Sequence, residues 1–192
     1  ERFASSFAIF HQRYSTNTFP TWRLAQPFRV LAHNGEINTL KGNVNWMKAH
    51  ECRLGAAAFG ESIEDLKPVI QPGASDSAAL DNVFELMVRA GRDLPMAKTL
   101  MIPEAWRDDS PIPEAHKDLY SYCNAVMEPW DGPAAICAYG GRWVLAGMDR
   151  NGLRPLRYTI TQDGLLFAGS ETGMVRLDES RILEKGRLGP GQ

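Results

Sequence analysis

Sulfur ligands and long apolar runs are scarce in this sequence of 192 residues. Its three cysteines, Cys52, Cys123 and Cys137, are widely spaced and show no C-x-x-C pairing. A disulfide framework, a zinc site and an iron–sulfur site are therefore not indicated. The four histidines show no helical spacing of metal ligands. No apolar run approaches the roughly 18 residues that span a bilayer, so no membrane partner is expected.

An excess of charge of one sign is also missing. The chain has 21 Lys and Arg against 23 Asp and Glu, a formal net charge of -2. This balance argues against nucleic acid as a partner. The opening "ERFASSFAIF" lacks the zones of a signal peptide, so a cytoplasmic protein is expected. A hydrophobic content of 44% at this length allows one domain with a sizeable core.

Apolar periodicity predicts an α+β order of elements. Strands are expected at 3–10 and 28–33, with a helix near 37–51 and a connecting segment at 55–74. A second helix begins at Ser75 or Ser77, which are candidate N-caps, and ends at Gly91. Residues 95–102 are ambiguous between helix and strand, and 115–127 are expected to be helical. From Pro133 onward short strands at hairpin spacing predict an antiparallel meander, and two packed sheets with helices outside are the simplest arrangement.

The two ends of the sequence suggest a piece of a longer polypeptide. There is no initiator Met, the chain begins in a predicted strand, and it stops at "RLGPGQ" directly after a turn signal.

The first polar cluster is Arg13-Tyr14-Ser15-Thr16, after the predicted strand at 3–10. An arginine there can hold a carboxylate through two parallel hydrogen bonds, and Thr16 can add a hydroxyl contact. An ordinary surface arginine is the commoner explanation of such a tetrapeptide taken alone.

Two further clusters lie where elements meet. The amide of Asn34 and the backbone N–H of Gly35 can act as paired donors for an oxyanion, although an isolated Asn-Gly more often marks a turn. Asp76 can receive an ammonium group, although an acid in the first turn of a helix also serves the helix dipole. A cation, an anion and a donor pair together complement glutamine, but none of the three cysteines has an evident activating base.

The order of four motifs resembles the class II glutamine amidotransferases of the N-terminal-nucleophile hydrolase superfamily. The motifs are "RYST", "HNGEI", "SDS" and "DRNGLRPLRY". The stretch "FHQRYSTNTFPTWRLAQPFRVLAHNGEINTLKGNVNWM" further resembles the glutaminase domains of glutamate synthases. The resemblance covers essentially the whole chain.

That resemblance implies a four-layer αββα sandwich and a set of site residues. Arg13 and Thr16 would bind the α-carboxylate of glutamine, and Asp76 would bind its α-amino group. Asn34 and Gly35 would form the oxyanion hole. The "DRNGLRP" segment would be a structural signature of the second sheet, with no catalytic role for its charged residues.

The chain departs from the family at its nucleophile. The family uses a cysteine at the mature N-terminus, with the α-amino group as its base, and residue 1 here is Glu1. We therefore expect 1–192 to be the C-terminal part of an amidotransferase domain, incomplete at both ends and inactive alone.

The intact parent, by the same resemblance, hydrolyses glutamine through a cysteine thioester and passes ammonia to a synthase domain that aminates 2-oxoglutarate. That domain would use FMN, an iron–sulfur cluster and NADPH or ferredoxin, and no cofactor is expected in this chain. Expected partners are L-glutamine, the synthase domain and a small reductase subunit, in the cytoplasm or, in a plant, the plastid stroma.

Two other functions fit parts of the pattern. One is a non-catalytic amino-acid-binding or regulatory module, which the missing nucleophile favours. The other is an amidotransferase with another acceptor, such as phosphoribosyl pyrophosphate, a sugar phosphate or aspartate. The segments "FPTWRLAQPF" and "KGNVNWM" favour glutamate synthase over these acceptors.

Overall fold

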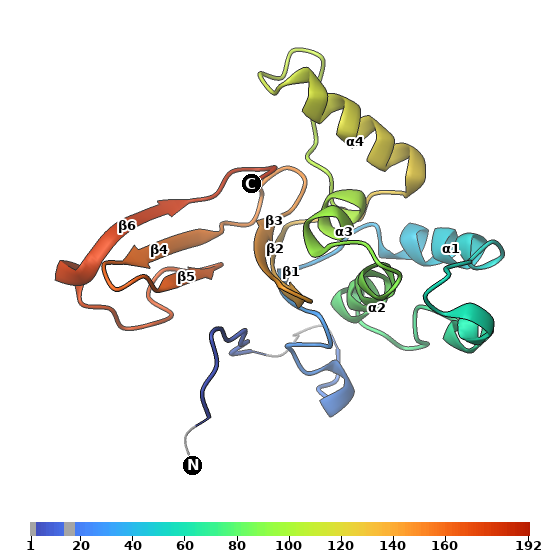
Figure 1. The fold of residues 1–192 in the computed structure, drawn as a ribbon, viewed down its shortest axis with the longest axis horizontal. Coiled ribbons are helices and arrows are strands. Elements are labelled where there is room, and N and C mark those ends of the chain that lie inside the picture. The colour runs from blue at the N-terminus through green and yellow to red at the C-terminus, as the bar shows by residue number, and fades with distance from the viewer. Residues whose placement is uncertain (1–2, 14–17) are drawn as a thin grey trace.

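Two antiparallel sheets and four α-helices make up the computed structural model, which describes residues 3–13 and 18–192. The first sheet has the order β1-β2-β3 and the second the order β5-β4-β6 (Figure 1). Their strands are β1 Leu31–Gly35, β2 Ala134–Gly140, β3 Trp143–Met148, β4 Arg157–Thr161, β5 Leu166–Gly169 and β6 Ile182–Arg187. The predicted α+β class with two antiparallel sheets is confirmed.

Two of the helices pack on the first sheet, and the other two pack on those helices. They are α1 Leu40–Glu51, α2 Asp76–Arg89, α3 Leu94–Met101 and α4 Glu114–Val126, with 3-10 turns at Trp22–Leu24, Gly60–Leu66 and Glu179–Arg181. All four α-helices lie on the side of the first sheet that faces away from the second sheet (Figure 1). Of the four expected layers, the described residues supply this helical layer and both sheets. No helix among them is long and apolar enough to cross a membrane.

The main core lies between α2, α3 and the first sheet. The predicted apolar face of α2 is buried there through Leu80, Val83, Phe84 and Met87. Each such side chain contributes about 1.5–3 kcal/mol when it is fully removed from water. The helix begins as predicted, because the Ser75 hydroxyl accepts a hydrogen bond from the Ala78 N–H at 3.2 Å.

The second sheet is held by a smaller cluster. Ala135 and Met148 of the first sheet pack with Leu156, and Leu188 covers them. The first and second sheets contact each other mainly through β2 and β5. The residue that follows β5, Ser170, thereby lies beside Asn34 at the end of β1.

The predicted strand at 3–10 is wrong. These residues have no regular secondary structure, and Phe3 is 97% exposed. A period-2 apolar pattern gives a strand only where another strand completes its hydrogen bonds. Here the segment makes a local bond between the Ser5 hydroxyl and the Phe7 carbonyl, and the Phe7 ring packs against Tyr139 with centroids 5.2 Å apart.

Other predicted elements occur with shifted limits. The strand predicted at 28–33 begins later, because Asp81 takes up the backbone N–H groups of residues 29–31. Of the ambiguous residues 95–102, all but Ile102 are helical, and Asp93 caps α3 by accepting from the Met96 N–H at 2.9 Å. The predicted meander is divided between the two sheets, and β6, which the sequence did not indicate, pairs with β4.

Candidate functional site

A cavity of about 610 Å³ lies where the end of β1, the start of α2 and the segment after β5 meet. Four of the five predicted site residues line it: Arg13, Asn34, Gly35 and Asp76. The fifth, Thr16, falls outside the described residues. Residues separated by more than 60 positions in sequence are thus gathered around one space large enough for an amino acid.

Asp76 links α2 to the segment that follows β1. Its Oδ2 accepts a hydrogen bond from the Ile37 N–H at 2.8 Å. Helix capping, the alternative explanation of this acid, is carried out by Ser75. Within the described part of the chain nothing bonds to Oδ1 of Asp76, so this oxygen is available to a ligand ammonium group.

The Asn-Gly pair ends β1 and is held from two sides. The Asn34 side-chain amide donates to the Ser170 hydroxyl at 2.8 Å, which leaves its second N–H for another acceptor. Gly35 has φ +145, and a Cβ there would overlap the carbonyl oxygen of Pro133. Close approach of the backbones therefore requires glycine at this position, whether or not its N–H binds a ligand.

His33 is a cavity residue that the sequence interpretation missed. It is 4% exposed, its N–H donates to Gln26 Oε1 at 2.7 Å, and its carbonyl lies 3.1 Å from Nε2 of His11. Its own Nε2 is buried without a partner among the described residues. Burial lowers the pKa of His33, and the negative charge of Asp76 opposes that effect. Its position directly before Asn34 was the only signal in the sequence.

Asp149 organises the turn between the two sheets. It is 1% exposed, and its two carboxylate oxygens accept four backbone hydrogen bonds at 2.9–3.0 Å. The donors are Ala134, Asn151, Leu153 and Arg154. A buried carboxylate needs such a set of partners, and this one joins β2 to the chain that leads into the second sheet.

Two arginines of the same turn differ in their surroundings. Arg150 donates to the Pro103 carbonyl at 3.1 Å and pairs with Asp131 at 3.3 Å. Arg154 lines the cavity instead, and its Nε is buried without a partner in the described structure. The "DRNGLRP" segment therefore contributes a side chain to the site as well as a turn.

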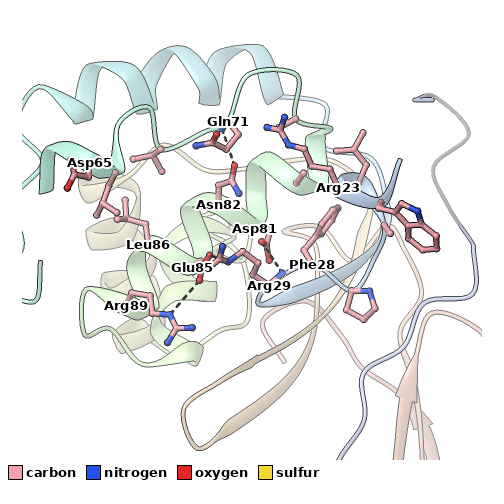
Figure 2. A pocket seen from close by; sticks show the side chains of 18 of the residues that line it. Arg23, Phe28, Arg29, Asp65, Gln71, Asp81, Asn82, Glu85, Leu86 and Arg89 are labelled. Atoms are coloured by element: carbon pink, nitrogen blue, oxygen red, sulfur yellow. Dashed lines mark hydrogen bonds and ion pairs between the residues drawn. The ribbon is translucent and has the colours of Figure 1, made fainter. Parts of the chain in front are cut away.

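A larger groove of about 890 Å³ lies beside α2 (Figure 2). Three of its charged side chains are bonded to one another, since Glu85 pairs with Arg29 at 2.8 Å and with Arg89 at 3.6 Å. Burial raises the pKa of Asp81. Three backbone N–H groups at the start of β1 donate hydrogen bonds to its carboxylate and oppose that effect. None of the four predicted site residues that the structure describes lines this groove.

The cysteines lie away from the cavity. Cys52 is exposed, Cys137 is half-buried and Cys123 is buried, and none is among the described residues that line the cavity. Burial raises the pKa of both Cys123 and Cys137, which disfavours the reactive thiolate. The described residues also contain no cluster of three or more His, Cys, Asp or Glu that could hold a metal ion.

Comparison with known proteins gives a family match over residues 1–192, to the model described as glutamine amidotransferases class-II. The NADPH glutamate synthase large chain of Azospirillum brasilense is 68% identical over all of this chain and 13% of its own length. The NADH glutamate synthase of Schizosaccharomyces pombe is 50% identical over 99% of this chain and 9% of its own. The chloroplastic ferredoxin-dependent glutamate synthase 2 of Arabidopsis thaliana is 47% identical over 98% and 12%.

The chain thus spans 9–13% of the length of these relatives. Among solved structures, the glutamine phosphoribosylpyrophosphate amidotransferase of B. subtilis matches with a TM-score of 0.38 and 18% identity, over 82% of this chain and 26% of that one. At that distance the structural match adds nothing to the family match.

Proposed function

The chain belongs to the class-II glutamine amidotransferases, and on this premise we propose that its cavity binds L-glutamine as part of the glutaminase domain of a glutamate synthase. The observation that carries the proposal is the gathering of Arg13, Asn34, Gly35 and Asp76 around one cavity. The 68% identity to a glutamate synthase large chain supports this parent over an amidotransferase with another acceptor.

The cavity offers one group for each polar end of glutamine. Oδ1 of Asp76 would accept a hydrogen bond from the α-ammonium group. The exposed guanidinium of Arg13 has no ion pair in the described structure and would bind the α-carboxylate. Thr16 would add its hydroxyl beside Arg13. The free N–H of Asn34 and the N–H of Gly35 would face the carboxamide oxygen and stabilise the oxyanion formed on attack.

The nucleophile is proposed to come from outside this chain. In the parent, a cysteine thiolate would attack the carboxamide carbon, ammonia would leave, and water would hydrolyse the γ-glutamyl thioester to glutamate. Because none of the chain's cysteines lines the cavity, we expect no sustained glutaminase turnover from residues 1–192 alone. Residues 1–192 would then be the C-terminal part of the amidotransferase domain.

The parent would pass ammonia to its synthase domain and aminate 2-oxoglutarate. FMN, an iron–sulfur cluster and NADPH or ferredoxin would supply the electrons there, with a small reductase subunit as a further partner. The cysteines of this chain lie in separate elements and do not fit a cluster site, so these groups would bind elsewhere in the parent. Cytoplasm or plastid stroma would suit such a protein, since a similar plant protein is named chloroplastic.

A non-catalytic amino-acid-binding module is the second candidate for the chain by itself. The absence of a cysteine from the described lining of the cavity favours it. The two candidates share the binding of glutamine and differ in whether a parent chain supplies the missing thiolate.

Calorimetric titration of L-glutamine into the chain tests the proposal. Asp76→Asn and Arg13→Ala should each weaken binding at least about tenfold, because each removes a charged partner. The same substitutions in the groove, Asp65→Asn and Arg89→Ala, are the matched controls and should leave binding unchanged. An ammonia assay in parallel should detect no turnover. Equal losses in the cavity and groove variants, or no binding by the unmodified chain, would contradict the proposal.

A further inference from the structure

We propose that Arg154 is a ligand-binding residue of this cavity, which contacts the side-chain end of the bound amino acid and holds the γ-carboxylate of glutamate more tightly than the carboxamide of glutamine. The proposal rests on the proposed function, because it assigns an additional residue to the same cavity. It changes the expectation that the charged residues of "DRNGLRP" serve only the turn.

The position of Arg154 follows from a chain of contacts that leads to Gly35. Oδ2 of Asp149 accepts both the Arg154 N–H at 2.9 Å and the Ala134 N–H at 3.0 Å. Ala134 is the register partner of Gly35 in the first sheet. One buried carboxylate oxygen therefore fixes the backbone of Arg154 beside β2. This strand pairs with β1, which ends in the proposed oxyanion hole.

Arg154 lines the cavity together with His33, Asn34 and Ser170. The positive charge of Arg154 acts on His33, the residue before Asn34, and contributes to the lowering of the pKa of His33. Ser170, which holds the Asn34 amide, lines the cavity together with Arg154. The turn residue, the strand end and the segment after β5 thus converge around the proposed carboxamide position.

The bonding of Arg154 is incomplete without a ligand. Arg150 of the same turn has both a carbonyl and a carboxylate partner, whereas Arg154 has no ion pair in the described structure and a buried Nε without a partner. A partly buried guanidinium is costly when unpaired, and a carboxylate is its best-matched partner. Asp76 lines the same cavity with one oxygen bonded to the Ile37 N–H and the other proposed for the α-ammonium group, and it forms no ion pair with Arg154 in the described structure.

The two amino acids differ only at the end that Arg154 would contact. Glutamate carries a second carboxylate where glutamine carries a neutral amide, and a charge-assisted hydrogen bond is roughly twice as strong as a neutral one. Arg13 and Asp76 would contact the α-carboxylate and α-ammonium groups, which both ligands share. The ratio of the two dissociation constants therefore isolates the contribution of Arg154.

The test is calorimetric titration of L-glutamine and of L-glutamate into the chain and into its Arg154→Gln, Arg154→Lys and Arg13→Gln variants, with circular dichroism to check folding. Arg154→Gln should weaken glutamate binding about tenfold or more and glutamine binding by no more than about threefold. Arg154→Lys keeps the charge and should restore most of the preference. Arg13→Gln is the matched control and should weaken both ligands by a similar factor.

The outcomes separate the two proposals. The proposed function stands if the unmodified chain binds glutamine and Asp76→Asn abolishes binding. The role of Arg154 is overturned if both Arg154 variants leave the ratio of the glutamate and glutamine dissociation constants unchanged. If the unmodified chain binds neither amino acid, both proposals fall. An equal loss for both ligands in Arg154→Gln, without rescue by Arg154→Lys, would show a structural role and also overturn the inference.

Discussion

The groove beside α2 and the cavity at the end of β1 differ in how their charged side chains are bonded. In the groove, Glu85 is shared by Arg29 and Arg89. In the cavity, Arg13 and Arg154 have no ion pair within the described part of the chain, and Nε2 of His33 is buried without a partner. The groove is the larger of the two. Arginines without a protein partner, rather than volume, are therefore the reason for proposing the cavity as the ligand site.

The largest expected effect comes from Gly35, which shapes the cavity and has no counterpart in the groove. Gly35→Ala places a Cβ against the Pro133 carbonyl at a φ of +145. We expect a loss of about 3 kcal/mol or more in the free energy of unfolding, because both strain and overlap must be relieved. Urea unfolding monitored by circular dichroism measures this loss.

Gly42→Ala is the control for that substitution. Gly42 lies inside α1, and a Cβ there would meet nothing within 4 Å. Alanine should therefore raise stability by about 0.5–1 kcal/mol. A neutral Gly35→Ala variant would show that the pairing of β1 with β2 is not as tight as described.

Acid should destabilise the fold through the cavity. Because burial lowers the pKa of His33, the unfolded chain binds a proton at this residue at a higher pH than the folded chain does. Stability should fall as pH drops through about 6.5, by at most about 1.4 kcal/mol per pH unit. Urea unfolding between pH 5 and 8 measures the slope, which His33→Asn should reduce and His116→Asn, at an exposed site, should keep. An unchanged slope in His33→Asn would contradict this account.

A smaller effect is expected at Ser170. Its hydroxyl fixes the orientation of the Asn34 amide at 2.8 Å. Ser170→Ala removes one hydrogen bond, which should lower stability by about 1 kcal/mol, and it frees the Asn34 amide to rotate, so glutamine affinity should fall about fivefold. Ser110→Ala, outside the cavity, removes a comparable hydroxyl bond at 2.8 Å and should leave affinity unchanged. Equal affinities for both variants would mean that Asn34 does not contact the ligand.

The smallest effect is expected in the groove. Arg89→Gln removes an exposed ion pair with Glu85 at 3.6 Å, which Arg29 continues to hold. Both stability and glutamine affinity should change by less than about 0.5 kcal/mol. A marked loss of affinity would remove the distinction between the two cavities.

The helices were predictable where local signals agreed. In α2 the cap at Ser75, the apolar face and Gly91 at φ +102 all point to the same element. The strand predicted at 3–10 failed because its pattern does not reveal whether a partner strand is available. The pairing of β6 with β4 likewise depends on contacts between residues distant in sequence.

Short motifs predicted which residues gather around the cavity, and their proposed roles stay predictions. Arg13, Asn34, Gly35 and Asp76 do line one cavity, which spacing alone could not establish. The contribution of Arg154 was missed because its neighbours suggest a turn. Only the four backbone bonds to Asp149 and the place of that turn beside β2 bring its side chain to the cavity.

Two asparagine side chains, followed by NMR during a titration with L-glutamine, show most directly whether the ligand binds in the cavity or in the groove. Asn34 lies in the cavity and donates to Ser170, whereas Asn82 lies in the groove and accepts from the Gln71 N–H at 3.1 Å. The side-chain amide signals of Asn34 should shift with saturation while those of Asn82 stay in place. Shifts at Asn82 without shifts at Asn34 would place the ligand in the groove and contradict the account.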